Sequence, residues 1–229
     1  MSPLLRQKIG RAALNAAGIA VFLFAVFPVY WMVATAFKPN DQIFTTEFIP
    51  FPDPPSLDHV SRVFVKGVAG HSVWRYLLNS AIVALATVVV GAVFALLAAT
   101  AVARFRFRFR TTFLILLLIV QMVPAEALLI PLFTTINRLG LYDRLLGLVV
   151  VNVGLTLPFS IWMLRTFVAA VPKELEEAAW IDGAGRATAF WRVLFPLVAP
   201  GLVATSIFSF ITTWNEFVYA LTLINDQGK

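Results

Sequence analysis

Five long runs of apolar residues set the architecture of this chain. They cover roughly residues 13–36, 76–103, 112–133, 145–171 and 193–214. A helix that crosses the hydrocarbon core of a bilayer needs about 20 mostly apolar residues, so each run is long enough to be a membrane span. The composition agrees, because 60% of the residues are hydrophobic and 13% are charged, against about half and a quarter in a typical soluble domain. The sequence therefore predicts an all-α protein, a polytopic bundle of transmembrane helices.

The basic residues indicate how the chain crosses the membrane. Lys and Arg cluster at the ends of the apolar runs, with three before the first run and four in the connection 104–110. Connections on the cytoplasmic side carry such an excess. We therefore expect residues 1–11 to form a cytoplasmic N-terminal tail and the connection 172–192 to be cytoplasmic too. The net charge of +6 has this topological explanation, so no nucleic-acid partner is expected.

The first apolar run also resembles a secretory signal peptide, since basic residues precede it. Its length of about 26 residues, from Ala12 to Phe37, exceeds the roughly 7–15 residues of a signal-peptide core. We expect an uncleaved first span. The following segment, 38–75, contains five prolines, which oppose both helix and sheet. We expect it to be an irregular extracytoplasmic loop with room for short helices.

One face of the second run carries small residues. Ala84, Thr87, Gly91, Ala95 and Ala98 are three or four positions apart, which places them on one side of a helix. Small residues let helix backbones approach closely in lipid. The pattern favours packing within this chain, and packing against a second membrane subunit is the alternative.

The connection after this run alternates arginine and phenylalanine from Arg104 to Arg110. A strand that binds nucleic acid with stacking rings would have such a pattern. A short cytoplasmic turn is the simpler interpretation, in which Arg sets the topology and Phe dips into the membrane interface.

Polar residues within or beside the apolar runs are candidates for a translocation path. They are Gln121, Glu126, Asn152, Asn215 and Glu216. Each is costly in lipid and is therefore expected to face protein or a water-filled cavity. Glu126 lies between Pro124 and Pro131, and irregular backbone at that depth is tolerated only against protein or a cavity. A structural hydrogen bond is an equally good explanation for each residue.

No catalytic or ATP-binding pattern is present. The sequence lacks a His-Glu-x-x-His metal motif, a Gly-x-Ser-x-Gly nucleophile elbow and a Gly-x-x-x-x-Gly-Lys-Ser/Thr phosphate loop. It also has no cysteine, which removes disulfides and thiolate metal sites. We therefore expect this chain to be no enzyme and to bind no cofactor or metal itself.

The connection 172–192 is a polar, acidic island between two apolar runs. Pro172 suits a helix start, and the glutamates that follow it would lie in the first turns, where the helix dipole favours negative charge. Asp182-Gly183 is a turn signal, and a second short helix, roughly 187–194, can follow before Pro196. A helix resting on lipid is the alternative. Acidic residues are unfavourable near an anionic leaflet, so we expect a groove in a partner protein to bind this helix–turn–helix.

The spacing within the island resembles the Glu-Ala-Ala loop of ABC importer permeases. That pattern is Glu-Ala-Ala, three residues, Gly, nine residues, then Ile-x-Leu-Pro. This chain has Glu177-Ala178-Ala179, Gly183 and Val193-Leu194-Phe195-Pro196, with Val for Ile and Phe for Leu. Further stretches, among them Gln121-Met122-Val123-Pro124 and Trp214-Asn215-Glu216-Phe217, are similar to the carbohydrate branch that includes the smaller maltose permease.

The resemblance implies a type I importer in a bacterial or archaeal inner membrane. Its parts would be this permease, a second homologous permease, two ABC ATPase subunits that bind ATP and Mg, and a solute-binding protein that delivers a sugar. The island would dock in a cleft of one ATPase and move with it. The residues implied in this coupling are Glu174, Glu177, Ala178, Ala179, Asp182, Gly183, Ala184 and Pro196.

The resemblance leaves the solute and the length of the domain open. A permease for a glycerol phosphate or a polyol is the first alternative, and a membrane assembly protein without a transport role is the second. Such permeases have six spans, whereas this chain ends soon after its fifth apolar run. The expected domain is thus a type-1 permease domain over 12–229 that lacks its last span, with its core at about 75–229 and an extracytoplasmic C-terminus.

Overall fold

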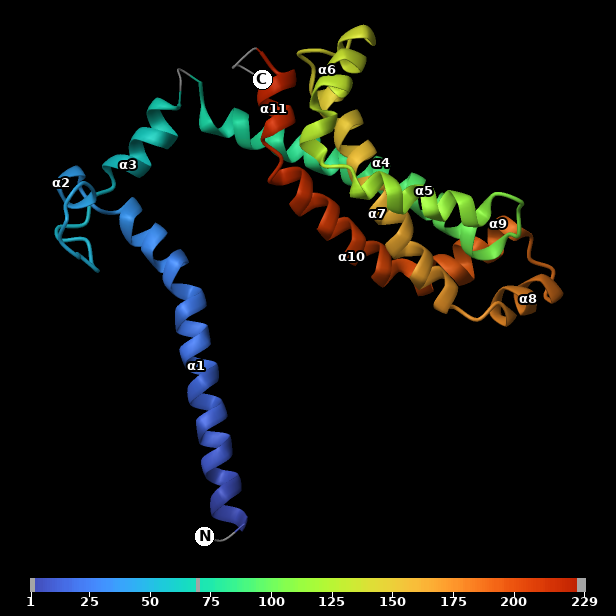
Figure 1. The fold of residues 1–229 in the computed structure, drawn as a ribbon, viewed down its shortest axis with the longest axis horizontal. Coiled ribbons are helices and arrows are strands. Elements are labelled where there is room, and N and C mark those ends of the chain that lie inside the picture. The colour runs from blue at the N-terminus through green and yellow to red at the C-terminus, as the bar shows by residue number, and fades with distance from the viewer. Residues whose placement is uncertain (1–2, 69–70, 226–229) are drawn as a thin grey trace. The chain divides into compact units, whose positions relative to one another are not determined.

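The computed structural model describes residues 3–68 and 71–225, with side chains from residue 7 onward. The extreme ends of the predicted N-terminal tail and of the C-terminus lie outside these residues. The chain divides into two compact units, Met1–Val73 and Trp74–Lys229, and each is described by itself. Every regular element of the described residues is a helix (Figure 1).

The first unit is built on the long helix α1, Pro3–Ala36. No residue of its most apolar window is buried within the chain, so its surface is free to face lipid or other subunits. The helix agrees with the first predicted span and also includes residues 3–11, so the basic residues of the predicted tail lie on the same helix.

The segment after α1 is irregular, as predicted, and contains the short helices α2 (Asn40–Ile43), α3 (Asp58–Ser61) and η1 (Arg62–Lys66). It folds back on the end of α1. The Trp31 ring stacks on Phe48 with 5.2 Å between centroids, and the Lys38 ammonium lies 4.0 Å from the Trp31 centroid. The Tyr30 hydroxyl donates a hydrogen bond to the Pro50 carbonyl.

The second unit is a bundle around three long helices. These are α4 (Val73–Arg104), α7 (Leu145–Ala170) and α10 (Phe195–Trp214). They agree with the second, fourth and fifth predicted spans. Together with α1, four helices among the described residues are long and apolar enough to cross a membrane, or five if one bent pair is a single span.

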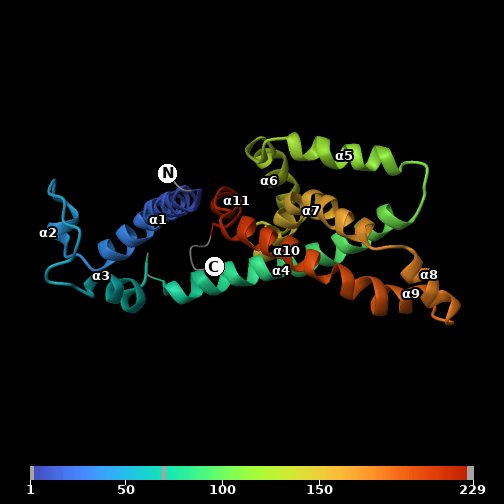
Figure 2. The ribbon, with the colours of Figure 1, turned by 90° about the horizontal axis from the view of Figure 1, so that it is seen from below.

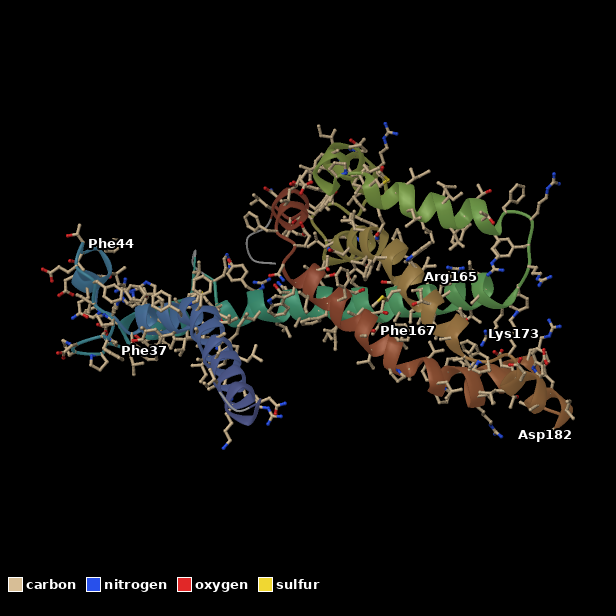
Figure 3. All side chains as sticks on the ribbon, turned by 60° about the horizontal axis from the view of Figure 1, so that its bottom comes forward. Phe37, Phe44, Arg165, Phe167, Lys173 and Asp182 are labelled. Atoms are coloured by element: carbon tan, nitrogen blue, oxygen red, sulfur yellow. The ribbon has the colours of Figure 1, made fainter. Side chains whose placement is uncertain are left out.

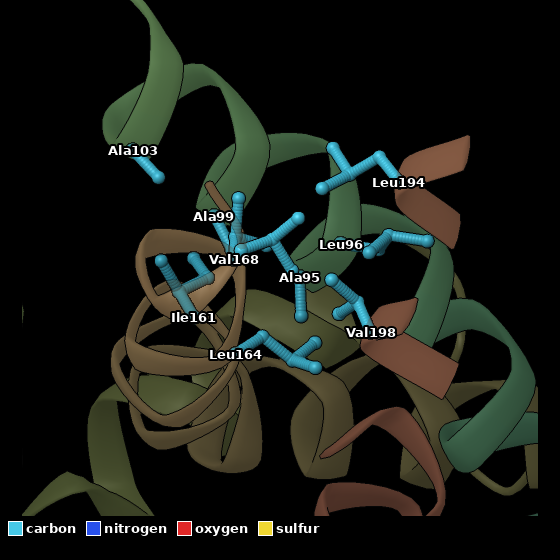
Figure 4. Packing of buried hydrophobic residues seen from close by; sticks show 10 residues of the cluster. Ala95, Leu96, Ala99, Ala103, Ile161, Leu164, Val168, Leu194 and Val198 are labelled. Atoms are coloured by element: carbon cyan, nitrogen blue, oxygen red, sulfur yellow. The ribbon is translucent and has the colours of Figure 1, made fainter. Parts of the chain in front are cut away.

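Small residues of α4 form the centre of the bundle. Ala95 and Ala99 are fully buried in a cluster with Leu164 and Val168 of α7 and Val198 of α10 (Figure 4). The rest of the predicted small-residue face agrees: Ala84, Thr87 and Gly91 are buried and Ala98 is half-buried. The face therefore packs within this chain, which confirms the favoured alternative.

The third predicted span, 112–133, is wrong as a single helix. Helix α5 (Arg110–Met122) is followed by η2 (Ala125–Leu128) and α6 (Leu129–Arg138), and the chain bends by 94° at the break (Figure 2). Pro124 is the cause, because a proline forces the residue before it into extended backbone. Val123 has φ −75° and ψ 123°. The apolar run continues through this break, so hydrophobicity alone hid it.

The predicted short helix at 187–194 is present, but it does not end before Pro196. Helix α9 (Arg186–Ala189), the π-helix η3 (Phe190–Leu194) and α10 form one continuous helical stretch, Arg186–Trp214. Pro196 lies at the start of α10, directly after the wider π turn. In membrane helices, local π adjustments of this kind re-satisfy backbone groups that a proline leaves without a partner. After α10, a short helix that the sequence did not predict, α11 (Val218–Leu223), completes the described chain.

Candidate coupling surface and membrane cavity

The acidic island forms the helix α8, Glu174–Ile181, between α7 and α9. Its first residue is two positions later than Pro172, the predicted start, and Lys173 is the N-cap. Three glutamates lie in the first turn, where the partial positive charge of the helix terminus stabilises carboxylates. In Figure 3 the labels Lys173 and Asp182 mark the two ends of this helix.

The end of α8 is a Schellman turn built on Gly183. The Ala184 N–H donates to the Ala179 carbonyl at 2.9 Å, and the Gly183 N–H donates to the Trp180 carbonyl at 3.1 Å. This pair of bonds closes a helix through a residue in the left-handed conformation, usually glycine. Gly183 has φ +85°. The spacing from Ala179 to Gly183 is therefore the spacing that ends this helix, and the turn predicted at Asp182-Gly183 is present.

The coupling residues inferred from the sequence lie at the surface of this unit. Glu174, Glu177, Ala178, Asp182, Gly183 and Pro196 are exposed, while Ala179 and Ala184 are half-buried. Large apolar side chains are exposed beside them: Ile181 is 87% exposed and Trp191 59%. Leu175 and Trp180 are also exposed. Exposed apolar side chains beside an acidic helix are typical of a surface that binds another protein or a membrane.

Glu176 differs from its neighbours because its side chain faces inward. The Arg104 Nε at the end of α4 donates to its Oε1 at 2.6 Å. The same guanidinium donates from Nη2 to the Val171 carbonyl at 3.0 Å. Sequence reasoning gave neither residue a specific role, because four arginines alternate in 104–110 and nothing in that pattern distinguishes Arg104.

The five translocation-path candidates line one cavity of about 840 Å³. Gln121 and Glu126 come from the broken α5–α6 segment, Asn152 from α7, and Asn215 and Glu216 from the two positions directly after α10. Apolar side chains form much of the remaining wall, among them Phe159 and Phe208. The structure thus places around one hollow the residues that the sequence identified separately.

Two of these residues also make structural hydrogen bonds. The buried Asn152 donates from Nδ2 to the Leu148 carbonyl at 2.9 Å, one helical turn earlier. The Glu216 carboxylate accepts hydrogen bonds from the Tyr219 N–H at 2.6 Å and the Ala220 N–H at 3.1 Å. It therefore caps the free N–H groups at the start of α11.

Tyr219 connects α11 to the break in the third apolar run. Its hydroxyl donates to the Ala125 carbonyl at 2.6 Å, so a backbone group beside Pro124 has a partner. Burial raises the pKa of the Tyr219 phenol, and the charges of Glu216 and Glu126 raise it further. The phenol therefore stays protonated and remains a donor at neutral pH.

No three metal-ligating His, Asp or Glu side chains converge anywhere in the described ranges.

Comparison with known proteins identifies the family. Residues 91–228 match the family described as "Binding-protein-dependent transport system inner membrane component". The chain belongs to this family. This permease is 41% identical over 224 residues to a diacetylchitobiose uptake system permease of Streptomyces coelicolor, a match that covers 98% of the chain and 79% of the relative. It is 34% identical to a trehalose transport system permease of Mycobacterium tuberculosis, covering 87% and 71%.

A solved structure has the same fold. A bacterial ABC transporter involved in the import of the acidic polysaccharide alginate superposes with a TM-score of 0.82, covering 98% of this permease and 78% of that chain, at 23% identity. The all-α membrane fold and the resemblance to ABC importer permeases are thereby confirmed. The relatives are transport permeases rather than enzymes.

Proposed function

We propose that this permease is the membrane subunit of an ATP-driven, binding-protein-dependent importer of a sugar. The two relatives described above support a sugar, since they are named as permeases for diacetylchitobiose and trehalose. A second permease would complete the path, and a solute-binding protein would deliver the sugar. ATP and Mg would bind only to two partner ATPases. Importers of a polyol or a glycerol phosphate are the alternatives that the solute assay distinguishes.

One observation supports this proposal above the others: the exposed surface of α8 and its Schellman turn. We define the coupling surface by eight residues, seven within the segment 172–192 and one at the start of α10: Glu174, Glu177, Ala178, Ala179, Asp182, Gly183, Ala184 and Pro196. A chain without a phosphate loop must receive force from another protein. This surface combines exposed carboxylates, for which basic groups of an ATPase are suitable partners, with exposed apolar side chains that a groove can cover.

The cavity supports the second half of the proposal. Five polar side chains line it, and they are suited to hydrogen-bond a hydroxylated solute: the amides of Gln121, Asn152 and Asn215 and the carboxylates of Glu126 and Glu216. Its aromatic walls are typical of ligand sites. In the membrane, segment 172–192 and residues 1–11 would lie on the cytoplasmic side. The described part of 12–229 would form the type-1 permease domain.

The test is reconstitution of the whole importer in proteoliposomes. With a second permease, ATPases and binding protein from the same source, we expect ATP-dependent uptake of a labelled disaccharide and no uptake of a polyol or of glycerol phosphate. Glu177→Gln should reduce uptake by weakening docking, whereas Glu47→Gln, at an exposed position in the first unit, should not. Failure of the wild-type chain to co-purify with the ATPases would refute the coupling role.

A further inference from the structure

Arg104 joins the ends of three helical segments. It is the last residue of α4, its Nε binds the Glu176 carboxylate of α8 at 2.6 Å, and its Nη2 binds the Val171 carbonyl at the C-cap of α7 at 3.0 Å. The final carbonyls of a helix have no partner within that helix. A guanidinium presents several N–H groups in a fixed fork, so one side chain can bind the end of α7 and the first turn of α8 together.

This contact is largely shielded from water. The side chains of Arg104 and Glu176 are 9% and 11% exposed. Arg106 and Arg108, from the same alternating run, are exposed. Removal of one partner from a buried pair leaves an uncompensated charge and is strongly unfavourable, whereas exposed ion pairs contribute little. Arg104 therefore has a defined structural position that Arg106 and Arg108 lack.

The helices that Arg104 joins are also packed together at this level. Ala99 and Ala103 of α4 are in one buried cluster with Val168 of α7 (Figure 4). Val171, the C-cap of α7, belongs to the same cluster. Leu194, in the stretch that leads into α10, belongs to the same cluster. The ends of α4 and α7 therefore form a close-packed junction, and such junctions resist deformation.

Adjacent glutamates of α8 have opposite environments. Glu176 is buried and pairs with Arg104, whereas Glu177, the next residue, is exposed. One carboxylate connects α8 to its own bundle, and the other is available to a partner. A helix held on both sides in this way can pass a displacement from the partner to the bundle.

We propose that Arg104 is a positioning residue for coupling: through Glu176 and the Val171 carbonyl it fixes α8 to the ends of α4 and α7, so that movement of α8 displaces both membrane helices. The inference rests on the proposed docking of α8 to an ATPase. Without the Arg104 contact, we expect α8 still to dock, because its exposed surface is intact, but to move without carrying α4 and α7 with it.

The experiment measures solute imported per ATP hydrolysed by the reconstituted importer. Arg104→Gln and Glu176→Gln each remove one charge of the pair, and Arg106→Gln is the matched control at an exposed arginine. We expect the two pair variants to retain their ATPase subunits and to lose roughly tenfold in solute per ATP, within the usual range of coupling free energies. The control should equal wild type. Reversal of the pair, Arg104→Glu with Glu176→Arg, should raise the solute imported per ATP roughly threefold or more above that of the single variants.

The outcomes separate this inference from the proposed function. Pair variants that import as much solute per ATP as Arg106→Gln would overturn it. Loss of the ATPase from Glu176→Gln would also overturn it, because Glu176 would then contact the partner directly. If the single variants do not accumulate in the membrane, the reversed pair decides, since only a direct contact lets exchanged charges restore accumulation and coupling. A wild-type complex that hydrolyses no ATP during uptake would instead refute the proposed function.

Discussion

Substitutions of Gly183 distinguish two possible requirements of the turn after α8: a left-handed backbone at this residue, and free space for a side chain. Gly183 has φ +85°, and a Cβ built there meets no atom of this chain within 4 Å. Alanine at this position would therefore not clash within the permease. It would have to adopt the left-handed conformation, at a cost of roughly 1–2 kcal/mol for most residues. Asparagine adopts this conformation more readily, so it adds a larger side chain with less backbone strain.

The magnitude follows from the two hydrogen bonds that close the turn. They require the left-handed backbone at Gly183, so the strain is subtracted from the free energy of docking if the turn must be intact in the complex. A loss of roughly 1–2 kcal/mol weakens binding by about 5- to 30-fold. We expect Gly183→Ala to weaken ATPase binding by this factor. If backbone strain is the cause, Gly183→Asn should weaken ATPase binding less than Gly183→Ala does. If the ATPase leaves no space for a side chain, Gly183→Asn should weaken binding at least as much.

The assay is the affinity of the purified ATPase for the permease in nanodiscs, with uptake by the same variants in proteoliposomes. Gly185→Ser is the matched control, because Gly185 has extended backbone, φ −69° and ψ 162°, and Ser is favoured at its N-cap position. The reasoning is refuted if Gly183→Ala binds the ATPase as tightly as Gly185→Ser.

Two further predictions concern the stability of the bundle. Tyr219→Phe leaves the Ala125 carbonyl without its donor and should reduce the free energy of unfolding by roughly 1–2 kcal/mol; a thermal midpoint equal to wild type in detergent would contradict this. Gly201→Ala would place a Cβ 2.3 Å from the Phe167 ring and should lower the midpoint through overpacking of roughly 1–3 kcal/mol. Gly18→Ala is the control, because a Cβ built at Gly18 meets no other side chain within 4 Å. An equal effect of the two substitutions on the midpoint would contradict the prediction, since it would show that α7 and α10 tolerate the added methyl group.

The strongest sequence patterns predicted the structure well. Long apolar runs located α1, α4, α7 and α10, because lipid requires continuous helices with satisfied backbone groups. The turn at Gly183 was also predictable, since Asp-Gly after a short amphipathic helix indicates a helix end. These features depend on local sequence alone.

Features that depend on distant residues were missed. Arg104 and Glu176 are 72 positions apart, and only the folded bundle shows which arginine of the run meets which glutamate. The prolines at 124 and 131 indicated irregular backbone around Glu126, but the 94° bend after Met122 was missed because the chain is apolar on both sides of Pro124. Glu216 was predicted as a path residue, and its hydrogen bonds to the start of α11 could not be inferred because α11 itself was not predicted.

The central claim is that α8 couples this permease to an ATPase on the cytoplasmic side. The sequence has no cysteine, so Ala178→Cys provides a single thiol at an exposed position of the coupling surface. We predict that a short bifunctional reagent joins this thiol to the ATPase in the assembled importer, and that an impermeant maleimide labels it from the cytoplasmic side alone. Labelling from the extracytoplasmic side, without a crosslink to the ATPase, would contradict the claim.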